Sequence, residues 1–313
     1  MSSPLLDVHD LCVTYRSSRG PVPAVRGVSI HLDRGETLGL AGESGSGKSS
    51  MTMALLRLLP VGTTVTGSVT LAGEDVMAMK PGRLRAVRWA EAAVVFQGAQ
   101  HVLNPVQRID RQIREAVDVH RGTNKVADLL EQVGIPRWRS ASYPHELSGG
   151  QKQRVMIAMA LACDPELLIA DEPTTALDVM VQAQVLQLLA DLQRDRGLAM
   201  IFITHDLSVL STVADRLAVM YAGRLVEIGP AKEMLRGAKH PYTKALAAAF
   251  PTIGDQSSRL APSGLAGDPP DPAAVPSGCP FHPRCPIATQ ECAHTAVELR
   301  EISPGWEAAC LKL

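Results

Sequence analysis

A glycine-rich segment in the first quarter of the chain has the residue types and the spacing needed to bind phosphate groups. Between a strand-like and a helix-compatible stretch it reads Gly42-Glu43-Ser44-Gly45-Ser46-Gly47-Lys48-Ser49. In such a loop the glycines let backbone N–H groups turn inward around a phosphate, and the helix that follows adds its positive end. We expect Lys48 to reach the β- and γ-phosphate oxygens and Ser49 to bind Mg²⁺. A merely flexible glycine turn would not need the flanking strand and helix.

Two adjacent carboxylates follow an apolar, strand-like run later in the chain. Residues 167–170 are Leu-Leu-Ile-Ala, and Asp171 and Glu172 come directly after them. Ligands of α/β folds bind at the carboxyl ends of strands, so Asp171 is expected to bind Mg²⁺, directly or through water. Glu172 is the better candidate for polarising an attacking water. Without the glycine-rich loop, a solvated acidic strand end would be the simpler interpretation.

Two further polar residues stand at the ends of apolar runs. Gln97 follows Val94-Val95-Phe96, and His205 follows Ile201-Phe202-Ile203-Thr204. Taken singly, each is more easily explained as a surface residue. Because the carboxyl ends of parallel strands share one sheet edge, we interpret both as candidates for sensing a γ-phosphate, with Gln97 also a candidate Mg²⁺ ligand.

A second motif with anion-binding character begins a helical stretch and reads Leu147-Ser148-Gly149-Gly150-Gln151. Ser148 can cap the helix, and the two glycines expose further backbone N–H groups. A simple N-cap would need only Ser148. Since a single nucleotide hardly needs two such helix ends from one chain, we expect head-to-tail pairing in which each partner completes the site of the other.

Strand-like and helix-like segments alternate around these motifs. Alternating apolar residues predict antiparallel strands at 6–15 and 28–32. A buried strand at 37–41 leads into the glycine-rich loop, and a helix is expected over 49–59. Further strands are predicted at 67–71, 92–96, 167–170 and 199–204, with a helix at 181–194. This order predicts an α/β fold with a parallel sheet covered by helices and a separate antiparallel β subdomain.

The remaining segments divide the chain into further parts. Residues 98–162 are charged and helix-like, including 126–133 and 151–162, and are interpreted as an inserted helical subdomain. Residues 251–278 contain six prolines and few aliphatic side chains, which is typical of a linker. The predicted organisation is a nucleotide-binding domain over 1–250, the Pro-rich linker, and a small Cys-rich extension over 279–313.

The overall composition is that of an ordinary globular protein. Hydrophobic residues make up 46% of the 313 residues, and the formal net charge is −1. Nucleic-acid binding normally needs a basic surface, so no nucleic-acid partner is expected. The N-terminal residues do not have the pattern of a signal peptide, and the longest apolar run, 155–163, falls short of the ~20 residues that span a bilayer. We expect a cytoplasmic chain whose membrane role comes through partners.

Four of the six cysteines lie close to the C-terminus, at Cys279, Cys285, Cys292 and Cys310. A cytoplasmic chain is not expected to hold stable disulfides, so metal ligation is the leading interpretation. Structural zinc sites usually use closely paired cysteines, which are absent here, whereas four thiolates also match a [4Fe–4S] cluster. Four free thiols are a third interpretation, although so short a segment can scarcely bury a core of its own.

In their order along the chain, these motifs resemble the ATP-binding cassette (ABC) family of P-loop ATPases. The similarity covers about residues 5–250 and rests on the glycine-rich loop, Gln97, the motif at 147–151, Asp171-Glu172, the turn Thr175-Ala176-Leu177-Asp178, and His205. The resemblance implies a nucleotide sandwich dimer in which Ser148, Gly149 and Gly150 grip the γ-phosphate of ATP held by the other subunit.

The resemblance also implies roles for single residues. Tyr15 matches the adenine-stacking aromatic of the family, Glu172 its general base and His205 its switch histidine. Asp178 is expected to link the two sites across the dimer. The implied nucleotide-binding set is Tyr15, Gly42, Glu43, Ser44, Gly45, Ser46, Gly47, Lys48, Ser49 and Ser50, and the implied Mg²⁺ ligands are Ser49, Gln97 and Asp171.

Within the family, three stretches are similar to the oligopeptide and dipeptide importer branch: Leu103-Asn104-Pro105, Tyr143-Pro144-His145-Glu146 and His240-Pro241-Tyr242-Thr243. Residues 278–286 resemble the C-terminal extension of that branch, whose members can carry a [4Fe–4S] cluster, and this favours iron–sulfur over zinc. Residues 98–101, Gly-Ala-Gln-His, depart from the small and hydroxylated residues usual in the branch. That segment is expected to face the membrane subunits.

The implied function is hydrolysis of ATP to ADP and phosphate, coupled to peptide uptake. The implied partners are a second ABC ATPase subunit, expected to be a paralogue, two transmembrane permease subunits and an extracytoplasmic substrate-binding protein. The chain would lie peripherally on the cytoplasmic face of the inner membrane. Alternatives are import of a nickel chelate or glutathione, a soluble ABC ATPase in DNA repair or translation, and an iron–sulfur sensor built on the tail.

Overall fold

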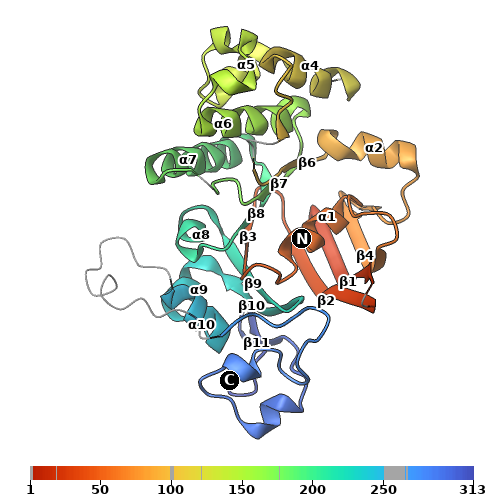
Figure 1. Ribbon diagram of the computed structural model, residues 1–313, viewed down its shortest axis with the longest axis vertical. Coiled ribbons are helices and arrows are strands. Elements are labelled where there is room, and N and C mark those ends of the chain that lie inside the picture. Colours follow the sequence, from red (N-terminus) through yellow and green to blue (C-terminus); the bar gives the residue numbers. More distant parts are fainter. Residues whose placement is uncertain are drawn as a thin grey trace. The chain divides into compact units, whose positions relative to one another are not determined.

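The computed structural model describes residues 3–18, 20–98, 102–120, 122–175, 177–249, 265 and 267–313, and Figure 1 labels its elements. The chain forms two compact units. Unit 1 comprises Met1–Leu5, Leu32–Thr37 and Ala78–Ile203, and unit 2 comprises Leu6–His31, Leu38–Met77 and Thr204–Leu313.

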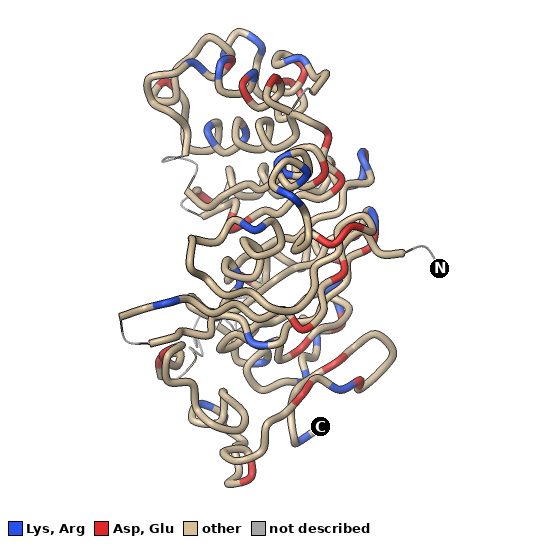
Figure 2. Tube along the Cα trace, turned by 90° about the vertical axis from the view of Figure 1, so that its right-hand side faces the viewer, with Lys and Arg blue, Asp and Glu red and all other residues tan. Residues whose placement is uncertain are grey.

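Charged residues of both signs are interspersed along the traced chain, without a long segment of one sign (Figure 2). This pattern agrees with the net charge of −1. Among the residues that the structure describes, no helix has the length and apolar character that crossing a lipid bilayer would require.

Unit 1 is built on parallel strands. β6 (Ala92–Val95) pairs with β7 (Leu167–Asp171), and β7 pairs with β8 (Ala199–Thr204). Every residue of β7 and β8 is buried, which explains why both read as continuous apolar runs rather than alternating ones. The three predicted strands are confirmed to within one residue at each end. The predicted helix at 181–194 is α7 (Val179–Arg196), two residues longer at each end.

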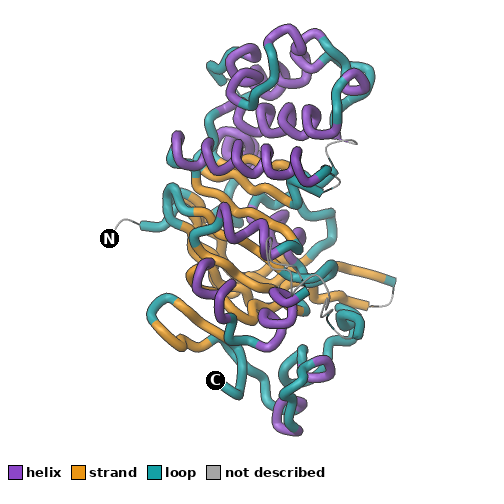
Figure 3. The backbone as a smooth tube through the Cα atoms, turned by 90° about the vertical axis from the view of Figure 1, so that its left-hand side faces the viewer, coloured by secondary structure: helices purple, strands orange, loops and turns teal. Residues whose placement is uncertain are grey.

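The described part of residues 98–162 consists of helices and loops, as Figure 3 shows. Its α-helices are α4 (Ile109–Val119), α5 (Val126–Gln132) and α6 (Gly149–Ala160), and its 3₁₀ turns are Arg137–Ala141, Pro144–Glu146 and Leu161–Cys163. α4 buries apolar residues at helical spacing, namely Ile109, Ile113, Ala116 and Val117. Helix α2 (Pro81–Ala90) precedes β6. Residues 99–101 of the predicted membrane-facing segment lie outside the described part.

Unit 2 contains an antiparallel sheet in the order β2 (Gly20–Leu32), β1 (Leu6–Ser17), β4 (Thr64–Leu71) and β5 (Glu74–Asp75). In β1 the buried residues shift from even to odd positions, because the pairing with β4 is irregular between His9 and Cys12. Asp10 lies there with a φ of 47°, as expected for a bulge. The predicted antiparallel sheet is therefore present, with longer strands than the sequence indicated.

A second set of strands in unit 2 carries the glycine-rich loop. β3 (Thr37–Ala41) has the predicted bounds and pairs in parallel with β9 (Arg216–Tyr221), which pairs antiparallel with β10 (Arg224–Pro230). β10 then pairs with β12 (Trp306–Ala308), and β12 with β11 (Arg300–Ser303). The C-terminal extension thus adds two strands to this sheet, which sequence reasoning did not anticipate. The accompanying helices are α1 (Lys48–Leu55), α8 (Leu207–Val213), α9 (Ala231–Gly237) and α10 (Pro241–Ala248).

The predicted helix at 49–59 is shorter than expected. α1 begins at Lys48 but ends at Leu55, and Arg57 has a left-handed φ of 51° that no α-helix accommodates. Of the predicted linker 251–278, residues 251–264 and 266 lie outside the described part of the chain. The extension after it also contains the 3₁₀ turns His282–Arg284 and Gln290–Ala293.

A fully buried carboxylate joins the extension to the rest of unit 2. Glu227 of β10 accepts hydrogen bonds from the backbone N–H groups of Lys239 and His240, at 2.8 and 2.9 Å, and from the indole N–H of Trp306, at 2.9 Å. Three donors supply the partners that a buried carboxylate needs. Glu227 therefore holds the turn before α10 and strand β12 against the same point of β10.

Replacing Glu227 by Ala is expected to destabilise unit 2 strongly. The change removes the acceptor of three N–H groups, of which those of His240 and Trp306 are buried, and this should lower the unfolding free energy by about 3–5 kcal/mol and the melting temperature by roughly 10 °C. Differential scanning calorimetry measures the shift. Glu233→Ala on the exposed side of α9 is the matched control and should change stability by less than about 0.5 kcal/mol. Equal melting temperatures for the two variants would contradict the role of Glu227.

Candidate nucleotide-binding site

The glycine-rich loop connects β3 to α1 in unit 2, as the sequence predicted. Two of its glycines are required by the space around them. A Cβ atom at Gly42 would lie 2.3 Å from the carbonyl oxygen of Met220, and one at Gly47 would lie 2.3 Å from that of Ala24. Their φ values, 151° and 104°, are also ones that other residues rarely adopt. The loop is thus packed closely against β9 and β2, so its backbone has little freedom to adopt another conformation.

Lys48 is buried and lies inside the curve of the loop. Its ammonium group donates to the carbonyl oxygens of Gly42 at 2.7 Å and Glu43 at 2.9 Å, and to the Ser46 hydroxyl at 3.4 Å. A phosphate held by the loop would face the same ammonium group. Ser49 is exposed at the start of α1, where a hydroxyl can reach a metal ion bound to phosphate oxygens.

Tyr15, the expected adenine-stacking residue, lies at the end of β1. Its hydroxyl donates to the Ser50 hydroxyl of α1 at 3.0 Å. The contact ties the aromatic residue to the helix that follows the loop. Two residues expected in one nucleotide site are therefore neighbours within unit 2.

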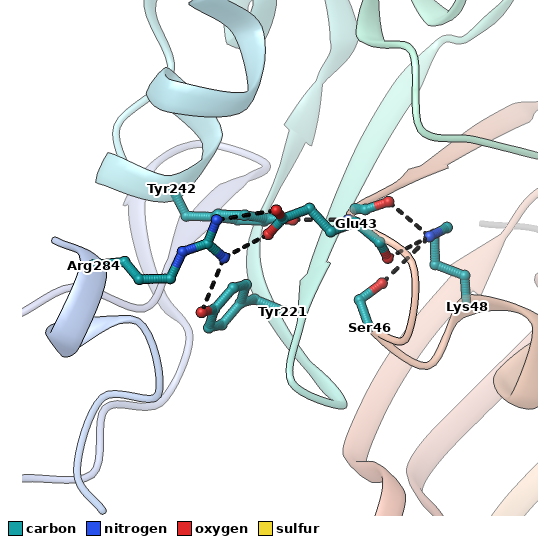
Figure 4. A network of polar contacts seen from close by, with 7 residues as sticks. Glu43, Ser46, Lys48, Tyr221, Tyr242 and Arg284 are labelled. Atoms are coloured by element: carbon teal, nitrogen blue, oxygen red, sulfur yellow. Dashed lines mark hydrogen bonds and ion pairs between the residues drawn. The ribbon is translucent and has the colours of Figure 1, made fainter. Parts of the chain in front are cut away.

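Glu43 has a partner that sequence reasoning missed. Its carboxylate accepts two hydrogen bonds from the guanidinium of Arg284, at 2.7 and 3.0 Å, and its backbone N–H donates to the Tyr242 hydroxyl at 2.9 Å (Figure 4). Arg284 belongs to the Cys-rich extension, 241 positions away along the chain. No local pattern signals such a contact.

In unit 1, the carboxylate predicted to act on water is held by two donors. Glu172 directly follows β7, and its carboxylate accepts from the Gln97 amide nitrogen at 2.9 Å and from the Thr175 hydroxyl at 2.8 Å. Glu172 also has a left-handed φ of 45°, a strained conformation typical of functional sites. Asp171, the last residue of β7, is buried. Gln97 and Glu172, selected separately from the sequence, are thus in direct contact.

The motif at 147–151 has the predicted helix-capping geometry. The Ser148 hydroxyl accepts from the backbone N–H of Gln151 at 3.3 Å, and the Gln151 side chain accepts from the backbone N–H of Ser148 at 3.1 Å. This reciprocal capping box starts α6 and leaves Ser148 exposed. A Cβ atom at Gly150 would lie 2.3 Å from Val181 of α7, so a glycine is needed there. Leu147 is buried beneath the motif.

The two remaining candidates lie at element boundaries. Asp178 caps α7 by accepting from the backbone N–H of Val181 at 3.0 Å, and Ala176 in the same turn lies outside the described residues. His205 directly follows β8, is exposed, and belongs to unit 2. Their predicted roles depend on a partner subunit and on bound nucleotide, and they stay predictions.

The four C-terminal cysteines line one small cavity of unit 2, together with His240 and Phe281. Burial raises the pKa of the Cys279 and Cys285 thiols, whereas a hydrogen bond with Thr289 lowers that of Cys292. Burial also lowers the pKa of His240 to about 4, so its ring is neutral and accepts the Tyr242 N–H at Nδ1. Among the described residues, no three His, Cys, Asp or Glu side chains converge closely enough to hold a single metal ion.

Comparison with known proteins identifies the family. A family model described as "ABC transporter" matches residues 25–175, and one described as "Oligopeptide/dipeptide transporter, C-terminal region" matches residues 226–292. A putative peptide import ATP-binding protein of Brucella ovis is 43% identical over 329 residues, covering 99% of this chain and 97% of the relative. The chain belongs to the ABC transporter family, in its oligopeptide/dipeptide branch.

Further relatives of this ABC protein are named as oligopeptide transport ATP-binding protein OppD. The protein from Salmonella typhimurium is 43% identical over 316 residues, covering 98% of this chain and 93% of the relative. The protein from Mycobacterium tuberculosis is 44% identical over 320 residues, covering 99% of this chain and 52% of the relative. The ABC protein described here thus spans about half the length of its mycobacterial relatives.

Solved structures support the ABC fold. The ATP-binding cassette MJ0796, in a dimeric post-hydrolysis state bound to ADP and Pi, matches 72% of this chain and 99% of its own, with a TM-score of 0.64 and 26% identity. The cbiO1 protein from Clostridium perfringens, part of the ABC transporter complex cbiONQ, matches 75% of this chain and 92% of its own, with a TM-score of 0.63 and 28% identity.

Proposed function

We propose that this ABC protein is the ATP-hydrolysing subunit of an importer of oligopeptides or dipeptides. The observation that carries the proposal is the loop around Lys48, whose buried ammonium group and closely packed glycines form a cradle for phosphates. The substrate class is supported by relatives named as oligopeptide transport and peptide import ATP-binding proteins.

The nucleotide is proposed to bind with its phosphates over the loop and its adenine against Tyr15. Lys48 would donate to the β- and γ-phosphate oxygens, and backbone N–H groups at the start of α1 would surround the β-phosphate. Ser49, Asp171 and Gln97 carry the oxygen atoms that Mg²⁺ prefers and are proposed as its ligands. When bound, Mg²⁺ supplies positive charge that offsets the charge on the phosphate oxygens.

The carboxylate of Glu172 is proposed to accept a proton from the attacking water. The hydrogen bonds from Gln97 and Thr175 orient that carboxylate, so it would not need to reorganise during the reaction. His205 is proposed to contact the γ-phosphate from the end of β8. Water attack then cleaves the bond between the β-bridging oxygen and the γ-phosphorus, and ADP and phosphate are released.

A second ABC subunit is proposed to complete each site. Ser148, Gly149 and Gly150 stand at the exposed N-terminus of α6, where backbone N–H groups can bind the γ-phosphate of ATP on a partner. Asp178 would link the two sites. We propose a paralogue as the partner. A dimeric cassette among the structural relatives supports pairing of two cassettes.

Two transmembrane permease subunits and an extracytoplasmic binding protein are the further proposed partners. The chain would sit peripherally on the cytoplasmic face of the inner membrane. Residues 98–101 are proposed to face the permease subunits, residues 98–162 to form an inserted helical subdomain, and residues 251–278 to be a linker before the extension.

Copurification with the permease subunits, followed by an ATPase assay, tests the proposed function. We expect Mg²⁺-dependent release of phosphate that increases when peptide-loaded binding protein is added to the reconstituted complex. The same complex with the binding protein alone is the control. A purified protein that binds no ATP at millimolar concentration would contradict the ATPase assignment, and stimulation by a non-peptide cargo alone would contradict the substrate class.

The cysteine cavity is proposed to hold a [4Fe–4S] cluster. Four thiols line one cavity, and burial raises the pKa of Cys279 and Cys285, an effect that a positively charged group bound there would offset. A single Zn²⁺ requires all four sulfurs within about 2.3 Å of one point. A [4Fe–4S] cluster would not need all four sulfurs at one point, and among the described residues no three ligands converge on a single metal ion.

Anaerobically purified protein is expected to contain about four iron and four sulfide per chain. Replacing Cys292, the buried member of the set, by Ser should remove most of the iron and sulfide. Cys163→Ser, outside the extension, is the matched control and should keep both. Stoichiometric zinc without sulfide in the parent protein would contradict the cluster.

A further inference from the structure

The turn that carries Arg284 projects from the cysteine extension towards the glycine-rich loop. Arg284 ends the 3₁₀ turn His282–Arg284, which lies between Cys279 and Cys285. The turn is held by backbone hydrogen bonds from the N–H of His282 to the carbonyl of Cys279, at 2.9 Å, and from the N–H of Arg284 to that of Phe281, at 3.0 Å. Figure 4 shows the guanidinium extending from this turn to Glu43.

The contact between Arg284 and Glu43 is a bidentate ion pair in a largely dry setting. The side chains are 7% and 23% exposed, and two N–H groups of the guanidinium face the two carboxylate oxygens. The hydrogen bonds that Arg284 donates to Glu43 raise the pKa of Arg284 above its ordinary value. A planar, charge-assisted pair of this kind is both stronger and more directional than an exposed one.

Aromatic side chains enclose the pair. The Tyr221 hydroxyl accepts from the Arg284 guanidinium at 3.3 Å, and the rings of Tyr221, Tyr242 and Phe281 pack on one another with centroids 4.6–5.3 Å apart. These residues come from β9, α10 and the extension, so three parts of unit 2 fix the position of the guanidinium. Because the Arg284 side chain is only 7% exposed, the ion pair is stronger than one at the surface.

Glu43 is therefore held at three points. Its carboxylate is bound by Arg284, its backbone N–H by the Tyr242 hydroxyl, and its carbonyl oxygen by the Lys48 ammonium. Glu43 thus accepts from Lys48 through its backbone and adds a carboxylate to the proposed phosphate-binding loop. Without a cation beside it, this carboxylate would repel a triphosphate.

We infer that Arg284 is a positioning residue for nucleotide binding, through which the cysteine extension neutralises Glu43 and holds the first turn of the phosphate-binding loop. The inference rests on the proposed ATP site and adds a residue outside the known motifs. In this role Arg284 contacts neither the phosphates of the nucleotide nor the attacking water. It acts through Glu43, and its effect is on affinity rather than on the chemical step.

The test is titration of the full chain with Mg·ATP and Mg·ADP, together with steady-state hydrolysis. Arg284→Met keeps the aliphatic stem and removes the charge. We expect the Kd for Mg·ATP to rise about 5–20-fold, the Kd for Mg·ADP to rise less, and kcat to stay within about twofold. The increase in the Kd for Mg·ATP should be smaller at higher salt concentration, because the effect is electrostatic.

The decisive variant is the double replacement Arg284→Met with Glu43→Gln. Removing the uncompensated carboxylate should bring the Kd for Mg·ATP back to within about threefold of the parent value, although the double variant has lost more contacts. If the role of Arg284 were purely structural, the double variant would bind Mg·ATP no more tightly than Arg284→Met alone. Arg300→Met, in β11 of the same extension, is the matched control and should leave the Kd unchanged.

Two results would overturn the inference: an unchanged Kd in Arg284→Met, or a raised Kd that Glu43→Gln does not restore. If Arg284→Met does not fold, Arg284→Gln replaces it, because the amide keeps a planar polar group but removes the charge. A Kd raised about 5–20-fold supports the inference, and an unchanged Kd overturns it. Failure of the parent protein to bind Mg·ATP would instead remove the proposed function itself.

Discussion

Replacing Glu172 by Gln is expected to slow ATP hydrolysis by about 100-fold or more, with the Kd for Mg·ATP within about threefold of the parent value. The amide keeps the shape of the side chain and its contacts with Gln97 and Thr175 but cannot accept a proton from water. Phosphate release and nucleotide titration measure the two quantities. The variant should also accumulate as a dimer in ATP, which size-exclusion chromatography detects.

The matched control is Glu166→Gln at the opposite end of β7. Glu166 is exposed and pairs with Arg34, so its replacement should leave turnover unchanged. Hydrolysis by the Glu172 variant at more than a tenth of the parent rate would remove Glu172 from the role of general base.

Lys48→Met is expected to weaken Mg·ATP binding by about 30–150-fold, because the variant loses a charged donor to the phosphates in a buried setting. Isothermal titration calorimetry measures the change. This effect should exceed that of Arg284→Met, since Lys48 would contact the nucleotide directly whereas Arg284 acts through Glu43.

Lys48 also cross-links its own loop, so the folded state of the variant has to be checked by its melting temperature. The control is Lys80→Met, an exposed lysine before α2, which should leave the Kd unchanged. A Lys48 variant that binds Mg·ATP as tightly as the parent would show that the loop does not hold the phosphates.

Local patterns predicted much of the fold. β3 has the predicted bounds, and the N-cap at Ser148 was expected from the residue types alone. Such features depend on backbone geometry and hydrogen bonds within a few residues, which sequence reports directly. The helix after the loop was predicted too long because the left-handed conformation of Arg57 has no strong sequence signal.

Contacts between distant segments were not predictable in the same way. The glycines at 42 and 47 were explained by backbone N–H groups that turn inward around a phosphate, but the structure shows that Met220 and Ala24 also leave no room for a side chain there. Likewise, β12 pairs with β10 across a long, Pro-rich stretch of sequence. These features depend on which segments pack together, and a single sequence contains no measure of that.

The order and spacing of Lys48, Ser148 and Glu172 were enough to predict phosphate chemistry, since each motif has a mechanism within its own few residues. The four C-terminal cysteines likewise indicated a metal or cluster site. Only the tertiary structure placed all four around one cavity and brought Arg284 beside Glu43. The reason is physical: hydrogen bonds between neighbouring residues follow from local sequence, whereas an ion pair across 241 positions depends on how unit 2 packs.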